Sequence, residues 1–65
     1  MSIERYQNQI KLIEKRIAIH HAEFDTQLAR GNIQSAQMHY MHMTQWIKIR
    51  AEIQAKLDTL ILAEF

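Results

Sequence analysis

The stretch Leu28-Ala29-Arg30-Gly31-Asn32-Ile33 divides the chain into two halves of nearly equal length. Gly31 is the only glycine among the 65 residues, and there is no proline, so the chain contains one strong helix breaker. A glycine can adopt the left-handed conformation that closes a helix, and Asn32 and Ser2 are both suited to cap a helix that follows them. The sequence therefore predicts a single helical hairpin over residues 1–65, with a helix over about 3–29, a turn at 30–32 and a helix over about 33–63.

Apolar residues recur at heptad spacing in both halves, as they do in coiled coils. If the chain folds back at the turn, Phe24 pairs with Ala36 and Ile3 pairs with Leu57. The predicted fold class is therefore all-α, an antiparallel, coiled-coil-like two-helix hairpin. The predicted hairpin core is the set Ile3, Tyr6, Ile10, Ile13, Ile17, Phe24, Tyr40, Met43, Ile47 and Leu57.

Six further large apolar residues fall outside this predicted core, at the c and g positions of the same heptad frame. In an antiparallel pair these positions lie on one side of the seam, and the opposite edge is mostly polar. A tryptophan and three isoleucines left in water would favour aggregation. We therefore predict an oligomer interface through which hairpins self-associate into a four-helix bundle or a larger helical oligomer. Its residues are Leu12, Ile19, Trp46, Ile49, Ile53 and Leu60.

The size and composition of the chain favour an oligomer and exclude several classes of protein. Domains this small usually need a disulfide, a metal or oligomerisation for stability. There is no cysteine, which excludes disulfides and thiolate metal sites, and the net charge of +1 gives no strong attraction to nucleic acid. No segment approaches the ~20 apolar residues that span a bilayer, and the N-terminus lacks the apolar core of a signal peptide. We therefore expect a cytoplasmic protein with no membrane partner.

The four histidines are the strongest candidates for a chemically active or metal-binding site. Zinc is bound by imidazole and carboxylate groups, and the best candidate ligands are His39, His42 and Glu23. These residues lack a specific spacing such as H-E-x-x-H, so we expect no metal and no cofactor. We expect His20 instead to lie in the seam and to form a hydrogen bond with the Tyr40 hydroxyl.

Two arginines are expected to link the helices. Arg50 interrupts the apolar seam, and its alkyl chain is long enough to carry the charged end to Glu14. We interpret Arg50 as a residue that fixes the register of the helices. Arg16 and Trp46 face each other at g positions, which predicts a cation–π contact.

The sequence gives less information about function than about the fold. It has no glycine-rich phosphate or oxyanion loop and few hydroxyl nucleophiles, so we expect no enzymatic activity. In length, central turn and heptad hairpin it is similar in architecture to the plasmid repressor-of-primer family, whose paired hairpins form a four-helix bundle. No motif is shared with that family, so the resemblance implies no RNA-contacting residue.

The leading hypothesis is a small homo-oligomeric adaptor or regulator from a phage, plasmid or bacterial accessory operon. It would act by binding a macromolecule, which we expect to be another protein. One alternative is a repressor-of-primer-like nucleic-acid binder, which the near-neutral charge does not favour. The other alternative is an inhibitor or subunit that docks its apolar side on a different protein.

Overall fold

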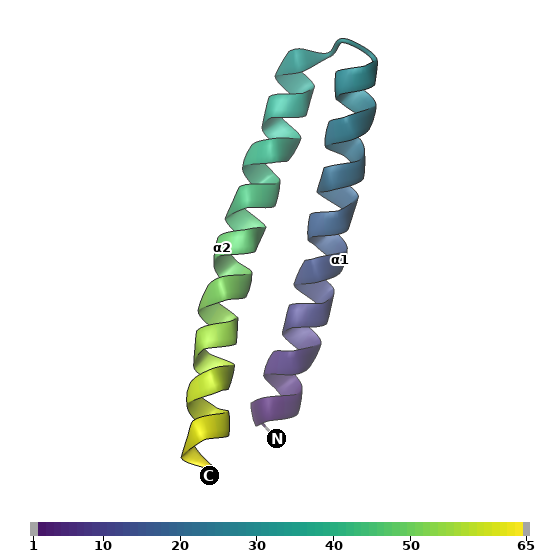
Figure 1. Ribbon diagram of the computed structural model, residues 1–65. Coiled ribbons are helices and arrows are strands. Elements are labelled where there is room, and N and C mark those ends of the chain that lie inside the picture. Colours follow the sequence, from purple (N-terminus) through teal and green to yellow (C-terminus); the bar gives the residue numbers. More distant parts are fainter. Residues whose placement is uncertain (1, 65) are drawn as a thin grey trace.

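The computed structural model describes residues 2–64, and the side chain of Ser2, with its expected cap, lies outside the description. The chain forms two helices, α1 (Ser2–Ala29) and α2 (Ile33–Ala63), whose bounds lie within one residue of the predicted ones. The helices run antiparallel and side by side, with the turn at one end and both termini at the other (Figure 1).

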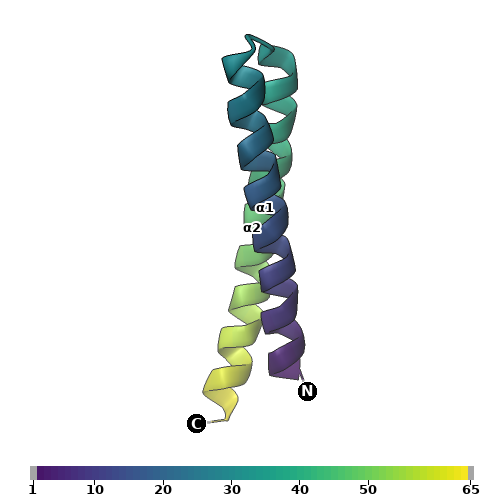
Figure 2. The ribbon, with the colours of Figure 1, turned by 90° about the vertical axis from the view of Figure 1, so that its right-hand side faces the viewer.

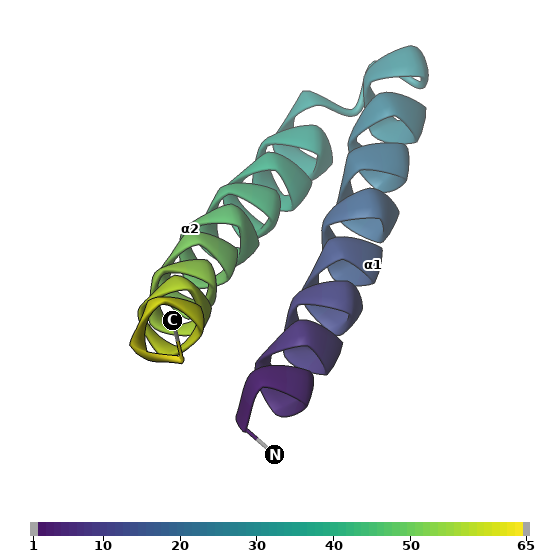
Figure 3. The ribbon, with the colours of Figure 1, turned by 60° about the horizontal axis from the view of Figure 1, so that its bottom comes forward.

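The hairpin is long and thin. Its Cα atoms extend over 51 × 14 × 12 Å. The two ribbons cross in the side view (Figure 2), and the helices lie side by side in a single layer when viewed from the open end (Figure 3). Each helix therefore packs one face against its neighbour and leaves the others to solvent. Over residues 2–64, neither helix contains a stretch that is long and apolar enough to cross a membrane.

The turn is closed by the two backbone hydrogen bonds of a Schellman motif. The N–H of Asn32 donates to the carbonyl of Gln27 over 2.9 Å, and the N–H of Gly31 donates to the carbonyl of Leu28 over 3.0 Å. Gly31 has a φ of 74°, in the left-handed region that glycine adopts without strain. The Asn32 side chain does not cap α2 and instead donates to the Gln27 side-chain oxygen over 3.2 Å. The turn is thus held chiefly by the end of α1.

The seam of α1 is the predicted one. Ile10 and Ile13 are buried on this stripe, and Ala36 and Leu57 are buried on the facing side of α2. The other predicted core residues of α1 are half-buried on the same stripe, as is Met43 of α2. These half-buried residues of α1 are Ile3, Tyr6, Ile17 and Phe24.

The seam of α2 differs from the prediction. Tyr40 and Ile47 are 52% and 48% exposed, so their predicted place in the core is wrong. Trp46, Ile53 and Leu60, predicted to lie outside the seam, are half-buried. In the turn half, the stripe of Tyr40 and Ile47 carries a tyrosine hydroxyl that keeps access to water, whereas Trp46, Ile53 and Leu60 form a stripe that is apolar over three heptads. Gln54, farther along the stripe of Tyr40, is half-buried. Rotation of α2 toward the more apolar stripe explains the difference.

Candidate interaction surface

One contact between the helices defines the side that carries the predicted interface residues. The Arg16 guanidinium carbon lies 5.2 Å from the centroid of the Trp46 ring, which confirms the predicted cation–π contact. Leu12 and Ile19 lie four residues before and three residues after Arg16, so they share its side of α1. Ile49 lies three residues after Trp46 and shares its side of α2. We call this surface the Trp46 side; it comprises Leu12, Ile19, Trp46, Ile49, Ile53 and Leu60.

Packing within the hairpin covers the Trp46 side only in part. Leu12 is 55% exposed, Ile19 is 61% exposed and Ile49 is 38% exposed. The other three members, all from α2, are half-buried between the seam and solvent. The exposed members therefore present large apolar side chains that the closed hairpin does not use.

The opposite edge of the hairpin is also partly apolar, although we expected it to be mostly polar. The ring of Tyr40 lies 5.7 Å from the ring of Phe24 on this edge. Ile33 and Ile47 lie seven residues from Tyr40 on the same stripe of α2, and Leu28 lies four residues after Phe24. All except Phe24 are exposed. This second apolar stripe is concentrated in the turn half, whereas the Trp46 side extends toward the open end.

A polar contact crosses the same opposite edge. Arg50 Nη2 donates a hydrogen bond to Glu14 Oε1 over 3.3 Å, as predicted. The Arg50 side chain is half-buried in the seam, and its charged end meets an exposed carboxylate. Exposed ion pairs contribute only about 0–1 kcal/mol, so we expect this contact to add little to the stability of the hairpin.

Three of the histidines meet in the turn half of the seam, on the edge that borders the Trp46 side. Nδ1 of His20 lies 3.3 Å from Nδ1 of His39, and the His20 ring stacks on that of His42 with 5.3 Å between centroids. The predicted hydrogen bond from His20 to Tyr40 is wrong, because the rotation of α2 places Tyr40 against Phe24. We call His20, His39 and His42 the histidine cluster.

The histidine cluster holds its central ring in an environment that disfavours a proton. Partial burial lowers the pKa of His20 from its ordinary value of 6.5, and His42, His39 and Arg16 lower that pKa further. Glu23 acts in the opposite direction. The candidate metal ligands named from the sequence, His39, His42 and Glu23, are not brought together as a set of three ligands in the part of the chain that the structure describes. Within residues 2–64, no group of three or more histidine, cysteine or acidic side chains is placed to hold a metal ion.

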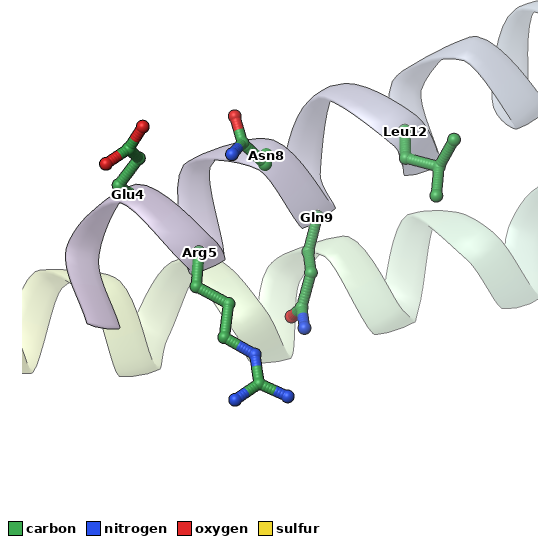
Figure 4. Close-up of a pocket in the computed structure, with 5 residues that line it drawn as sticks. All are labelled: Glu4, Arg5, Asn8, Gln9 and Leu12. Atoms are coloured by element: carbon green, nitrogen blue, oxygen red, sulfur yellow. The ribbon is translucent and has the colours of Figure 1, made fainter. Parts of the chain in front are cut away.

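A shallow depression lies near the open end of α1. It is lined by Glu4, Arg5, Asn8, Gln9 and Leu12, all from this one helix (Figure 4). Glu4 and Asn8 point away from Arg5 and Gln9 (Figure 4), so the polar groups do not converge as they do in a ligand pocket. Leu12 also belongs to the Trp46 side, and we treat the depression as part of that exposed surface.

Sequence reasoning missed the His20–His39 pair and the second apolar stripe. Both depend on which stripe of α2 faces α1. The sequence held one indication of the His20–His39 pair, because His39 lies seven residues before Trp46 and so shares its stripe.

The chain was compared with known protein families, with curated proteins and with solved structures, and none of them matches it.

Proposed function

We propose that the protein is a small, non-enzymatic interaction protein that assembles with a second copy of itself through the Trp46 side. The exposure of Leu12, Ile19 and Ile49, which have no role in closing the hairpin, carries this proposal. Two helices side by side enclose no interior, and domains of this size usually need a further source of stability. A second hairpin would supply it by completing a four-helix bundle.

The dimensions of the hairpin suit a symmetric pair. One long side of a body of 51 × 14 Å offers roughly 700 Å² before side chains are counted, close to the ~800 Å² per partner of a stable interface. The Trp46 side extends from Ile19, ten residues before the end of α1, to Leu60, three residues before the end of α2 at the open end. A two-fold axis through the Trp46 side would place this surface of one copy against the same surface of the other.

The assembled bundle would act as an adaptor or regulator by binding another macromolecule, which we expect to be a protein. The stripe of Ile33, Tyr40 and Ile47 lies outside the proposed pair and leaves apolar surface for such contacts. The net charge of +1 supports a protein partner over repressor-of-primer-like binding of RNA.

Charged substitutions at exposed positions separate association from hairpin folding. Leu12→Glu or Ile19→Glu places a carboxylate on the Trp46 side without entering the seam. In the proposed bundle that charge is buried without a partner, so each variant should dissociate at least about tenfold more readily in sedimentation equilibrium. Ile53→Glu is less informative because Ile53 is half-buried in the seam and its loss would also weaken the hairpin.

The matched control for Leu12→Glu is Met41→Glu. Met41 is 53% exposed, close to the 55% of Leu12. It lies two residues from both His39 and Met43, which face α1, so it points to the far side of α2. Met41→Glu should leave the sedimented mass unchanged. Equal effects of Leu12→Glu and Met41→Glu on that mass would contradict assembly through the Trp46 side.

A further inference from the structure

We infer that the histidine cluster is an acid-sensitive contact, which holds the turn half of the hairpin together when its rings are neutral and releases it when they are protonated. The inference concerns the hairpin itself and goes beyond the proposed self-association. It begins with the position of His20, the half-buried α1 residue that meets both His39 and His42 of α2.

The hydrogen bond between His20 and His39 depends on how many protons the two imidazole rings carry. A hydrogen bond between two Nδ1 atoms 3.3 Å apart needs one N–H group and one lone pair. Two neutral rings satisfy this requirement when one of them carries its hydrogen on Nδ1. A single added proton can also be shared by the pair. When both rings are protonated, both Nδ1 atoms carry hydrogen, so the bond is lost and two cations face each other.

The charges around the cluster oppose protonation of His20. On α1, Arg16 lies four residues before His20 and Glu23 lies three residues after it, so both share its side of the helix. On α2, His39 and His42 become like-charged neighbours as soon as they bind protons. Only Glu23 favours a cationic His20. With partial burial added, His20 binds a proton less readily in the folded hairpin than in the unfolded chain.

The direction of the pH effect follows from the lowered pKa of His20. In the unfolded chain an imidazole takes up its proton near its ordinary pKa of about 6.5. Above that pH, His20 is neutral in both states and the hairpin has its full stability. As the pH falls below 6.5, the unfolded chain binds a proton that the folded chain resists, so the free energy of unfolding falls.

Thermal unfolding of the full chain, followed by circular dichroism at one chain concentration, tests the inference. Between about pH 7.5 and about pH 5 the wild-type melting temperature should fall by about 4 °C or more. His20→Asn keeps a polar group near the position of Nδ1, but this group does not titrate. The melting temperature of this variant should therefore fall by no more than half as much as that of the wild type. Glu23→Gln removes the one stabilising carboxylate and should enlarge the fall.

His21→Asn is the matched control. His21 is the next residue, is exposed, and pairs with Asp25 at 3.6 Å. This variant should keep the full wild-type fall in melting temperature. A wild-type melting temperature that is the same at both pH values, or a full fall in His20→Asn, would overturn the inference.

A measurement on the wild type tests the inference even if the His20→Asn chain does not fold. Ring-proton NMR should show His20 titrating below pH 6.5, the ordinary value, in the folded hairpin. Titration of His20 at or above that value would overturn the inference regardless of the behaviour of the variants.

Discussion

Arg16 and Trp46 join the two helices near mid-length, with the guanidinium carbon 5.2 Å from the centroid of the indole ring. The contact bridges the apolar residues of α1 and those of α2 on the Trp46 side. The same contact was expected with Tyr40 and Ile47 in the core, so it is compatible with either rotation of α2. It therefore marks the Trp46 side but does not by itself explain the exposure of Tyr40 and Ile47.

Removal of the cation from this contact should weaken the hairpin measurably. Arg16→Gln is expected to lower the free energy of unfolding by about 0.5–1 kcal/mol, the usual contribution of a partly exposed cation–π pair. Urea unfolding at a fixed chain concentration measures the change. Lys15→Gln, at the exposed neighbouring position, removes the same charge without touching Trp46 and should have a smaller effect. Equal losses in the two variants would show that only net charge matters.

Replacement of Gly31 should destabilise the hairpin through backbone strain and not through a steric clash. A Cβ added at this position meets nothing within 4 Å, but φ is 74°, which other L-residues adopt with strain. Gly31→Ala is expected to lower the free energy of unfolding by about 1–2 kcal/mol in urea unfolding. Gly31→Asn should cost less, because asparagine tolerates the left-handed conformation. An alanine variant as stable as the wild type would refute the role of the Schellman turn.

Arg50 should contribute to orientation more than to stability. Glu14→Gln removes its ion-pair partner at an exposed site and should change the free energy of unfolding by less than about 1 kcal/mol. Arg50→Leu places an apolar side chain in the seam and should leave the melting temperature unchanged or raise it. A loss of several degrees in Arg50→Leu would show that the pair with Glu14 is a main source of stability.

Nucleic-acid binding should be weak. With a net charge of +1, the chain should bind RNA or DNA no more tightly than about 10⁻⁴–10⁻⁶ M at physiological salt, as in non-specific contacts. Fluorescence titration over a range of salt concentrations measures the affinity. Nanomolar binding would instead support the repressor-of-primer-like alternative, with Arg5, Lys11, Lys15 and Arg16 as the first residues to substitute.

Local sequence signals were enough to predict the helices and the turn. Gly31 serves to end a helix at its position. Because the sequence has no other strong helix breaker, one long helix is expected on each side of it. The seam of α1 was also predictable, because its large apolar residues concentrate on the stripe that contains Ile10 and Ile13. The pairing of Arg50 with Glu14 followed from the same register.

The rotation of α2 was not predictable from heptad spacing. This helix carries three adjacent apolar stripes, marked by Ile47, Met43 and Trp46, and a seam with α1 uses only two of them. The stripe that faces α1 carries His39, which meets His20 of the other helix, and no pattern within α2 contains that contact. The same ambiguity explains why Tyr40 was predicted in the core and why the second apolar stripe was missed.

The mass of the wild-type chain in solution tests the central claim most directly. Sedimentation equilibrium over a range of concentrations should give a mass of two chains, or a higher multiple, for a chain of 7.8 kDa. A monomer that aggregates as it is concentrated would favour docking of the Trp46 side on a different protein. A monodisperse species of 7.8 kDa at every concentration would contradict self-association through the Trp46 side.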